Sequence, residues 1–232
     1  MTCAHFAIVP AAGGGSRFGG AQPKQYQSIR GRSMLEHAVD ALARQKSITC
    51  VFVVLAPGDP DYARCRWSAD AEVMPLYCGG PTRACTVFNG LMAIRDRVED
   101  DDWIWVHDAA RPCVSQSELE RLMCALKGDE VGGLLALPVA DTLKRADEAG
   151  RVAATAPREG LWRALTPQVF RYRLLVEALH RAKGVAITDE AAAIEGLGLK
   201  PRLVAGAATN IKVTYPEDAG LAAAILAQRE GQ

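Results

Sequence analysis

The stretch FAIVPAAGGGSRFGGAQPKQY, residues 6–26, joins a short apolar run to a loop that contains five glycines. The apolar run is typical of a buried strand, and glycine-rich turns after a first strand commonly bind phosphate, because bare backbone N–H groups can converge on an anion. Arg17 and Lys24 lie in the same segment, which Pro23 keeps out of regular helix. The segment suits a nucleoside triphosphate. The alternative is a flexible surface loop with two solvated charges.

The loop matches neither of two common nucleotide-binding patterns. The dinucleotide fingerprint G-x-G-x-x-G fails, because counting from Gly13 places Phe18 at the last glycine and counting from Gly14 places Ser16 at the second. The P-loop pattern fails as well, since no lysine follows its second glycine. A long loop that carries its own cations is the remaining interpretation.

Three more apolar runs follow along the chain: VFVVL at 51–55, WIWVH at 103–107 and GLLALPV at 133–139. The segments between the runs have helical periodicity, and two helices show S-x-x-E capping boxes, at Ser33 with Glu36 and at Ser117 with Glu120. Alternating strands and helices are typical of a mainly parallel sheet. We predict an α/β fold, a Rossmann-like open sheet flanked by helices, in one domain over residues 1–232.

The composition excludes several classes of partner. The 232 residues include 27 basic and 27 acidic side chains, so no overall field attracts nucleic acid or a membrane. Seven cysteines are scattered without a CxxC pair, which argues against a disulfide framework or zinc site and favours reduced, buried thiols. The sequence shows neither a secretion signal nor an apolar run of the ~20 residues that cross a bilayer. We expect a cytoplasmic protein.

Residues 139–166 break the alternation of strands and helices. The sequence from Asp141 to Thr166, DTLKRADEAGRVAATAPREGLWRALT, is polar and β-compatible, with a turn at Glu148–Gly150. We predict a protruding β-arm. Because a long exposed hairpin is marginally stable alone, arm exchange within a homodimer is one interpretation, and packing on its own subunit is the other.

Motifs along the whole chain occur in the order that one enzyme family uses. The first loop has the form PAAG-x-G-x-R followed by PKQ, as in nucleotidyltransferases that activate sugars and polyols. The later motifs are GG-x-x-R (79–83), VHDAARP (106–112), PVADT (138–142), GLWRALTPQ (160–168), ITDEA (187–191) and NIKVTYPED (210–218). From residue 6 to about residue 226 the chain resembles the 2-C-methyl-D-erythritol 4-phosphate cytidylyltransferase family in its monofunctional form.

The resemblance implies transfer of CMP from CTP to 2-C-methyl-D-erythritol 4-phosphate, with release of pyrophosphate, in isoprenoid biosynthesis. A phosphate monoester has a second pKa of about 6, so the attacking oxygen is deprotonated at neutral pH and needs no general base. Two polyanions must approach in line, so positioning and positive charge are the expected means of catalysis. The resemblance assigns the catalytic cations to Arg17, Lys24, Arg158 and Lys212, with Lys24 foremost.

The same resemblance implies the other contacts. Nucleotide binding is assigned to Ala11, Ala12, Gly13, Gly14, Gly15, Gly79, Arg83, Thr86, Asp108 and Ala109. Acceptor binding is assigned to Arg111, Thr142, Arg158, Thr188 and Lys212. Family arms cross to the neighbouring subunit, so Thr142 and Arg158 would complete the partner's site in an obligate homodimer.

Asp108 follows the run WIWVH, which places it at the carboxyl end of a strand, where open α/β sheets bind ligands. A lone carboxylate would repel a triphosphate unless it holds Mg²⁺ while phosphates supply the other ligands. We predict that Asp108 binds Mg²⁺, another divalent cation or the ribose. The alternative is a helix cap. His107 is expected to be structural, since this reaction gives it no proton to move.

The chain departs from the family pattern at several positions. GGPTRACTV stands where many relatives have GGDERADSV, so Pro81 and Thr82 replace an acidic pair, and Thr209 precedes NIKVT where aspartate is usual. Two other functions stay open. One is a cytidylyltransferase for another polyol phosphate such as ribitol 5-phosphate, which calls for the same cations. The other is a nucleotide-binding regulator without catalysis.

Overall fold

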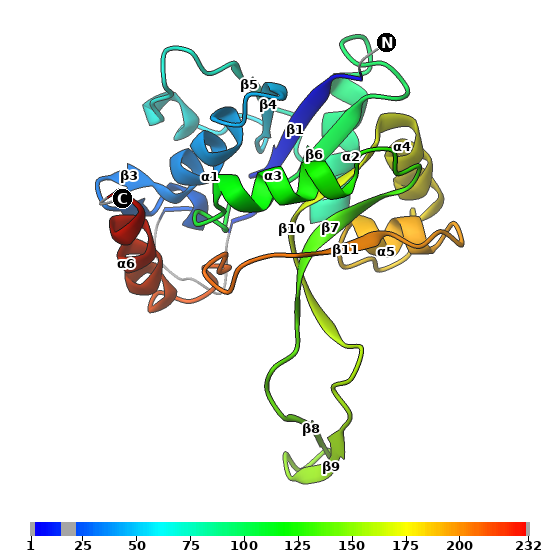
Figure 1. Ribbon diagram of the computed structural model, residues 1–232. Coiled ribbons are helices and arrows are strands. Elements are labelled where there is room, and N and C mark those ends of the chain that lie inside the picture. The colour runs from blue at the N-terminus through cyan, green and yellow to red at the C-terminus, as the bar shows by residue number, and fades with distance from the viewer. Residues whose placement is uncertain (1–2, 15–21, 231–232) are drawn as a thin grey trace.

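The computed structural model describes residues 3–14 and 22–230, and its centre is a seven-stranded sheet (Figure 1). Across the sheet the strands are β11 (Arg202–Ala205), β7 (Gly132–Pro138), β10 (Trp162–Arg171), β6 (Trp103–Val106), β1 (His5–Pro10), β4 (Ile48–Val54) and β5 (Val73–Leu76). Only β10 is antiparallel to its neighbours among these strands. The predicted mainly parallel sheet is confirmed, and the four apolar runs of the sequence form β1, β4, β6 and β7.

Helices cover both faces of the sheet, because successive strand residues point to opposite faces. In β1, Ala7 and Val9 belong to a core cluster with α1 and α3, while Phe6 and Ile8 belong to a cluster with α2, α4 and α5. A smaller cluster joins α6 to the short hairpin of β2 and β3. The bounds of these elements are α1 (Met34–Ala43), α2 (Arg83–Ala93), α3 (Gln116–Ala125), α4 (Tyr172–Arg181), α5 (Glu190–Glu195), α6 (Asp218–Glu230), β2 (Ser28–Ile29) and β3 (Arg32–Ser33).

The two predicted capping boxes have different outcomes. The box at α1 is confirmed, since the Ser33 hydroxyl accepts a hydrogen bond from the Glu36 N–H and the Glu36 carboxylate accepts one from the Ser33 N–H. The box predicted at Ser117 is wrong by two residues, because Ser115 and Glu118 cap α3. Glu118 is fully buried and also accepts a hydrogen bond from the chain after β11, so tertiary contacts select the capping serine.

Between β7 and β10 the chain leaves the body as a long arm that ends in the hairpin of β8 (Leu143–Ala146) and β9 (Val152–Ala156) (Figure 1). The Asp147 carboxylate stabilises the turn by accepting hydrogen bonds from N–H groups two and four residues further on. Most arm side chains are exposed. Residues 162–166 of the predicted arm belong to β10. The division into a single domain with an arm stays a prediction.

The seven cysteines are all free thiols. Cys50 and Cys113 are buried as expected, whereas Cys3, Cys85 and Cys124 are exposed, so the expectation of buried thiols is met only in part. Within residues 3–14 and 22–230, none of the helices combines the length and apolar composition required to cross a membrane.

Candidate active site

A cleft of about 510 Å³ opens beside β1, where β1 and β6 end. The chain order reverses at β1, because β4 and β5 follow on one side and β6 lies on the other, and open α/β sheets bind ligands at such points. The cleft walls are the loop after β1, η1 (Lys24–Tyr26), the turn before α2 and the loop after β6. The predicted site residues that line it are Ala11, Ala12, Gly13, Gly14, Lys24, Arg83, Thr86, Asp108, Ala109 and Lys212.

Backbone contacts bring the first loop against the turn before α2. The N–H groups of Ala11 and Gly79 donate to carbonyls at and just after the end of β4. A Cβ on Gly79 would lie 2.2 Å from the Cβ of Ala12, so a larger residue would push the two loops apart. The Gln25 side chain donates a 2.7 Å hydrogen bond to the carbonyl of Ala11. This glutamine ties the PKQ segment to the glycine loop.

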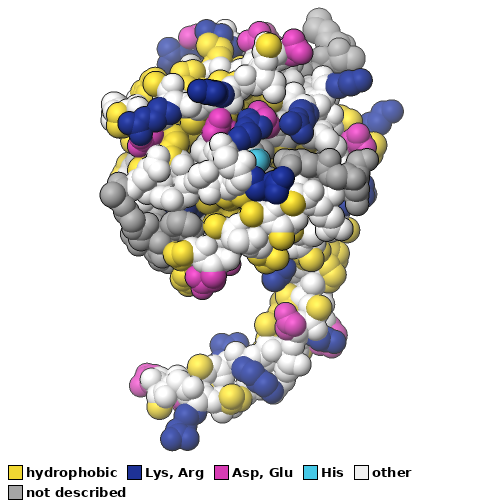
Figure 2. Space-filling model, turned by 90° about the vertical axis from the view of Figure 1, so that its left-hand side faces the viewer, with side chains coloured by type: hydrophobic (Ala, Val, Ile, Leu, Met, Phe, Trp, Pro, Cys, Tyr) yellow, Lys and Arg dark blue, Asp and Glu magenta, His cyan; other side chains and the backbone are white. Residues whose placement is uncertain are grey.

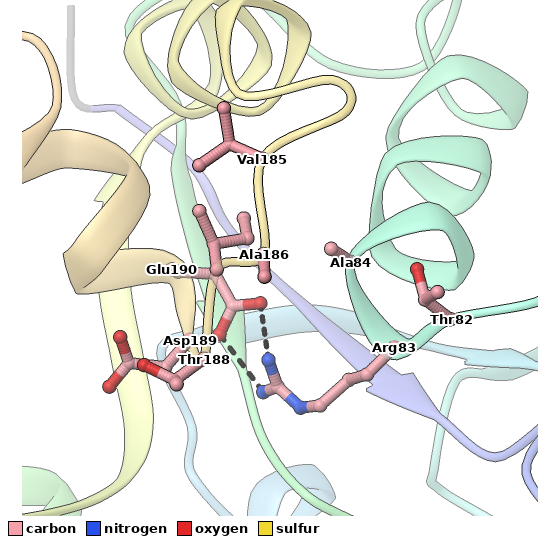
Figure 3. Close-up of a pocket in the computed structure, with 9 residues that line it drawn as sticks. Thr82, Arg83, Ala84, Val185, Ala186, Thr188, Asp189 and Glu190 are labelled. Atoms are coloured by element: carbon pink, nitrogen blue, oxygen red, sulfur yellow. Dashed lines mark hydrogen bonds and ion pairs between the residues drawn. The ribbon is translucent and has the colours of Figure 1, made fainter.

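Asp108 is the centre of a network of charged side chains. One carboxylate oxygen accepts from Arg83 Nε at 2.8 Å, and the other accepts from Lys212 Nζ at 2.7 Å. Arg83 also binds Glu190 through two hydrogen bonds of 2.6 and 2.9 Å, which Figure 3 shows. Asp108 follows β6, Arg83 begins α2 and Glu190 begins α5, so the fold joins segments that are distant in sequence.

Burial and charge together set the protonation of Asp108 and Arg83. Burial alone would raise the pKa of Asp108, but Arg83 and Lys212 hold that pKa well below its usual range. Burial alone would lower the pKa of Arg83, but the carboxylates of Glu190 and Asp108 raise it. Asp108 is therefore ionised at neutral pH, as a carboxylate that binds a metal must be.

His107 is completely buried and supports the backbone of Asp108. The Thr166 hydroxyl donates to His107 Nδ1 over 2.9 Å and accepts from the Asp108 N–H at 3.1 Å, while His107 Nε2 donates to the Arg111 carbonyl at 3.0 Å. Burial lowers the pKa of His107 to about 4, so the ring is neutral at pH 7. Both ring nitrogens are engaged inside the protein, which agrees with the predicted structural role.

Lys24 lies next to the same network. Its Nζ donates a 2.9 Å hydrogen bond to the carbonyl of Val213, the residue after Lys212. The structure therefore brings Lys24, Lys212 and Asp108 to one cleft, as the sequence predicted. Arg17 and Gly15, also predicted to bind the nucleotide, lie outside the described residues.

Arg111 and Thr188, both predicted acceptor contacts, lie beside the cleft. Arg111 is buried, and its guanidinium donates to two backbone carbonyls, at 2.7 Å to that of Asn210. Its observed contacts are therefore internal to the chain. Thr188 lines an adjoining pocket of about 230 Å³ together with Arg83 and Glu190 (Figure 3). Because Arg83 lines both the cleft and this pocket, the two spaces are neighbours.

Thr142 and Arg158, the remaining acceptor contacts, lie on the arm. Both side chains are exposed, and neither lines the cleft of its own chain. Arg158 donates a hydrogen bond to the carbonyl of Ala140. Figure 1 shows the arm extending away from the body that holds the cleft.

The residues that depart from the family pattern have roles in the structure. Thr82 caps α2, since its hydroxyl accepts a 3.1 Å hydrogen bond from the Cys85 N–H, and Pro81 lines the cleft. The Thr209 hydroxyl accepts a 3.0 Å hydrogen bond from Arg229. The network around Asp108 therefore forms without the acidic residues that these positions hold in many relatives.

Sequence reasoning did not single out Glu190, Gln25 or Thr166. Each lies inside a motif, in ITDEA, PKQ and GLWRALTPQ respectively, so motif membership was the available signal. Their partners are residues far along the chain or in another loop, and only the folded chain shows these pairings.

Comparisons with known proteins point to one family. The family model described as IspD, 2-C-methyl-D-erythritol 4-phosphate cytidylyltransferase, matches residues 5–228. The protein of that name from Nitrosospira multiformis is 56% identical to this chain, and the match covers 95% of this chain and 97% of that protein. The protein from Dechloromonas aromatica is also 56% identical, and the match covers 97% of this chain and 99% of that protein. A crystal structure of 4-diphosphocytidyl-2C-methyl-D-erythritol synthase has a TM-score of 0.85 at 40% identity, covering 97% of this chain and 99% of its own. The cytidylyltransferase structure from Thermus thermophilus has a TM-score of 0.77 at 33% identity, covering 96% and 98%.

Proposed function

The chain belongs to the 2-C-methyl-D-erythritol 4-phosphate cytidylyltransferase family, and from that premise we propose that its cleft holds CTP during catalysis. The protein is a cytidylyltransferase that joins CMP from CTP to 2-C-methyl-D-erythritol 4-phosphate and releases pyrophosphate. In this step an acceptor phosphate oxygen bonds to the α-phosphorus of CTP. The bond between that phosphorus and the bridging oxygen of the leaving pyrophosphate breaks.

The convergence of three cations beside the glycine loop is the observation that supports this site. Lys24, Arg83 and Lys212 come from three separate segments and line one cleft. The acceptor oxygen is already ionised, so the reaction requires alignment and neutralisation of charge. Lys24 is the cation we assign to the charge that develops on the α-phosphoryl group. Arg17 would add a second charge from the same loop.

We place a divalent cation at Asp108. Its ionised carboxylate lines the cleft, and Mg²⁺ commonly binds one or two carboxylates while substrate phosphates supply further ligands. The described residues contain no group of three or more His, Cys, Asp or Glu side chains that could hold a metal ion. Asp108 would hold Mg²⁺ together with phosphate oxygens of CTP, and the ion would neutralise part of the triphosphate charge. Arg83 and Lys212 orient this carboxylate.

Two of the residues that we assign to the acceptor lie away from the cleft of their own chain. Arg158 and Thr142 are exposed on the arm, whereas Thr188 lies beside Arg83. We infer that the arm of one subunit reaches the cleft of a second copy, so that Arg158 meets the acceptor phosphate there. The exposed two-stranded hairpin supports this inference, because such a hairpin gains stability by packing on another surface.

We also place the protein in the cytoplasm. All seven cysteines are free thiols, and three of them are exposed, as expected in a reducing compartment.

The direct test measures pyrophosphate release from CTP with Mg²⁺ and each of two acceptors. We expect kcat/KM to be at least tenfold higher with 2-C-methyl-D-erythritol 4-phosphate than with ribitol 5-phosphate, about 1.4 kcal/mol in transition-state binding. EDTA should abolish turnover. Binding of CTP without turnover would identify a regulator instead, and a preference for ribitol 5-phosphate would reassign the acceptor.

A further inference from the structure

Lys212, which pairs with Asp108 in the cleft, lies in a segment that needs support from other parts of the chain. Residues 206–213 follow β11 on the way to α6 and form neither helix nor strand, so no regular pattern of backbone hydrogen bonds holds them (Figure 1). The N–H groups of Gly206 and Val213 donate 2.9 Å hydrogen bonds, one to a carbonyl of β7 and one to a carbonyl of the loop after β6. Between these two contacts, side chains from outside the segment have to hold it.

Glu118 on α3 holds the middle of the segment. Its Oε1 accepts hydrogen bonds from the Ala207 N–H at 2.8 Å and from Asn210 Nδ2 at 3.3 Å. Asn210 Nδ2 also donates to the Thr166 carbonyl at 3.0 Å, and the reverse orientation of this amide would bring its oxygen against two acceptors. The Asn210 carbonyl in turn accepts a 2.7 Å hydrogen bond from Arg111. Glu118 and Asn210 therefore join the segment to α3 and to β10.

The burial of Glu118 makes these contacts demanding. Figure 2 shows Asp and Glu side chains at the surface of the body and of the arm, whereas Glu118 is completely buried. Its other oxygen, Oε2, accepts from the Ser115 N–H at 3.0 Å and from the Ser115 hydroxyl at 2.8 Å. All four donors are neutral. Because a buried carboxylate is costly unless its hydrogen bonds are made, the cap of α3 and the placement of the segment depend on the same side chain.

We propose that Glu118 is a positioning residue for CMP transfer. By fixing residues 206–213 against α3 and β10, it places the Lys212 ammonium 2.7 Å from the carboxylate of Asp108. Glu118 does not line the cleft, so it acts through Lys212 and touches neither substrate. The inference rests on the proposed function, because it requires Lys212 to act in the cleft.

The test removes the carboxylate and measures pyrophosphate release at saturating CTP. Glu118→Ala should lower kcat/KM for 2-C-methyl-D-erythritol 4-phosphate about tenfold or more, because small displacements of a group that acts in the reaction cost rate steeply. The KM for CTP should change by less than about twofold, since the segment carries no residue that we assign to the nucleotide. Circular dichroism and urea denaturation verify that the variant is folded.

A double-mutant cycle with Lys212→Ala separates positioning from general support of the fold. In the Lys212→Ala background, Glu118→Ala should change kcat/KM by less than about twofold, because the group that it positions is absent. Ser115→Ala is the matched control. It removes one hydrogen bond to Oε2 and weakens the cap of α3 but keeps both contacts of Oε1, so kcat/KM should stay within about twofold of wild type.

Equal losses in the two backgrounds would overturn the proposal, and so would wild-type kcat/KM in the Glu118→Ala enzyme. If Glu118→Ala does not fold, Asn210→Ala breaks the same link from the other side while Ser115 and Glu118 still cap α3, and the same outcomes decide. Wild-type kcat/KM in Lys212→Ala alone would remove Lys212 from the proposed function and this inference with it. An impaired Lys212→Ala enzyme with additive losses would remove only the role of Glu118.

Discussion

The cleft and the arm hold the predicted site residues in opposite ways. At the cleft, Asp108 is buried and both of its oxygens are bound, by Arg83 and Lys212. On the arm, Arg158 and Thr142 are exposed and flank the hairpin, whose strands β8 and β9 pair with each other. The cleft residues that we assign to the nucleotide are thus brought together by one chain, whereas Arg158 and Thr142, which we assign to the acceptor, do not line the cleft of their own chain.

The cleft is organised before substrates arrive, whereas the arm residues are not. Groups held by buried ion pairs cost little to reorganise during reaction, which is the condition for electrostatic catalysis. Exposed arm residues have to be ordered by a binding event, and that ordering takes part of the binding energy. Mutations in the cleft should therefore change kcat or stability, and mutations in the arm should change KM.

The largest expected effect is on kcat at the cleft. Lys24→Ala should lower kcat by about 10²–10³-fold, the usual result of removing one group that stabilises transition-state charge. The KM for CTP should change much less, because this charge is needed most in the transition state. Steady-state rates of pyrophosphate release provide the measurement. Lys46→Ala, at an exposed lysine after α1, is the control, and a Lys24→Ala enzyme with wild-type kcat would remove Lys24 from the mechanism.

A second large effect concerns stability. Glu190→Gln removes one partner of a buried ion pair with Arg83 and should lower the free energy of unfolding by about 3 kcal/mol. Glu177→Gln breaks an exposed pair with Arg181 on α4 and should cost less than about 1 kcal/mol. Urea denaturation of both variants compares them directly. Equal losses in the two variants would show that the Arg83 network adds no special stability.

A third effect, on the pH dependence of the free energy of unfolding, comes from His107 and is similar in size to the loss expected for Glu190→Gln. Its pKa falls from 6.5 in the unfolded chain to about 4 in the folded protein, so the unfolded state binds a proton first as pH decreases. Stability contributed by the neutral ring is present above pH 6.5 and is lost between pH 6.5 and pH 4, by roughly 3 kcal/mol in all. Urea midpoints measured at about pH 7 and about pH 4.5 for wild type and His107→Asn test this, since the variant should show a smaller decrease. Parallel decreases in both proteins would assign the acid sensitivity to other groups.

The sequence predicted the sheet because its apolar runs are short, β-rich and separated by helical periodicity, and these are local properties. It also predicted Lys24, Asp108 and Lys212 at one site, through motifs. It misplaced the cap of α3, since two serines two residues apart, Ser115 and Ser117, are locally equivalent. Burial of Glu118 decides between them, and that burial depends on the whole fold.

The pairing of Arg83 with Glu190 shows the same limit at the site. The two residues are 107 positions apart, and nothing in the local pattern of either selects the other. At Arg111 the motif predicts an acceptor contact, which stays a prediction, and the structure adds hydrogen bonds from its guanidinium to two backbone carbonyls that the motif does not reveal. Motifs identify residues that matter, but long-range contacts determine which of them face the cleft.

The smallest expected effect tests the arm. Arg158→Ala should raise the KM for 2-C-methyl-D-erythritol 4-phosphate about tenfold or more, the loss of one charge-assisted hydrogen bond, with little change in the KM for CTP. Arg151→Ala, at an exposed arginine near the arm tip, should leave both constants unchanged.

Mixing then decides whose cleft Arg158 serves. If arms cross, an equal mixture of Lys24→Ala and Arg158→Ala chains forms heterodimers with one intact site, so up to about a quarter of wild-type activity should return at low acceptor concentration. This recovery has to exceed the activity of each variant measured alone, and subunit exchange has to be verified with differently tagged chains. Verified heterodimers without recovery would mean that each arm serves its own subunit, so the acceptor half of the site would not be shared between two chains.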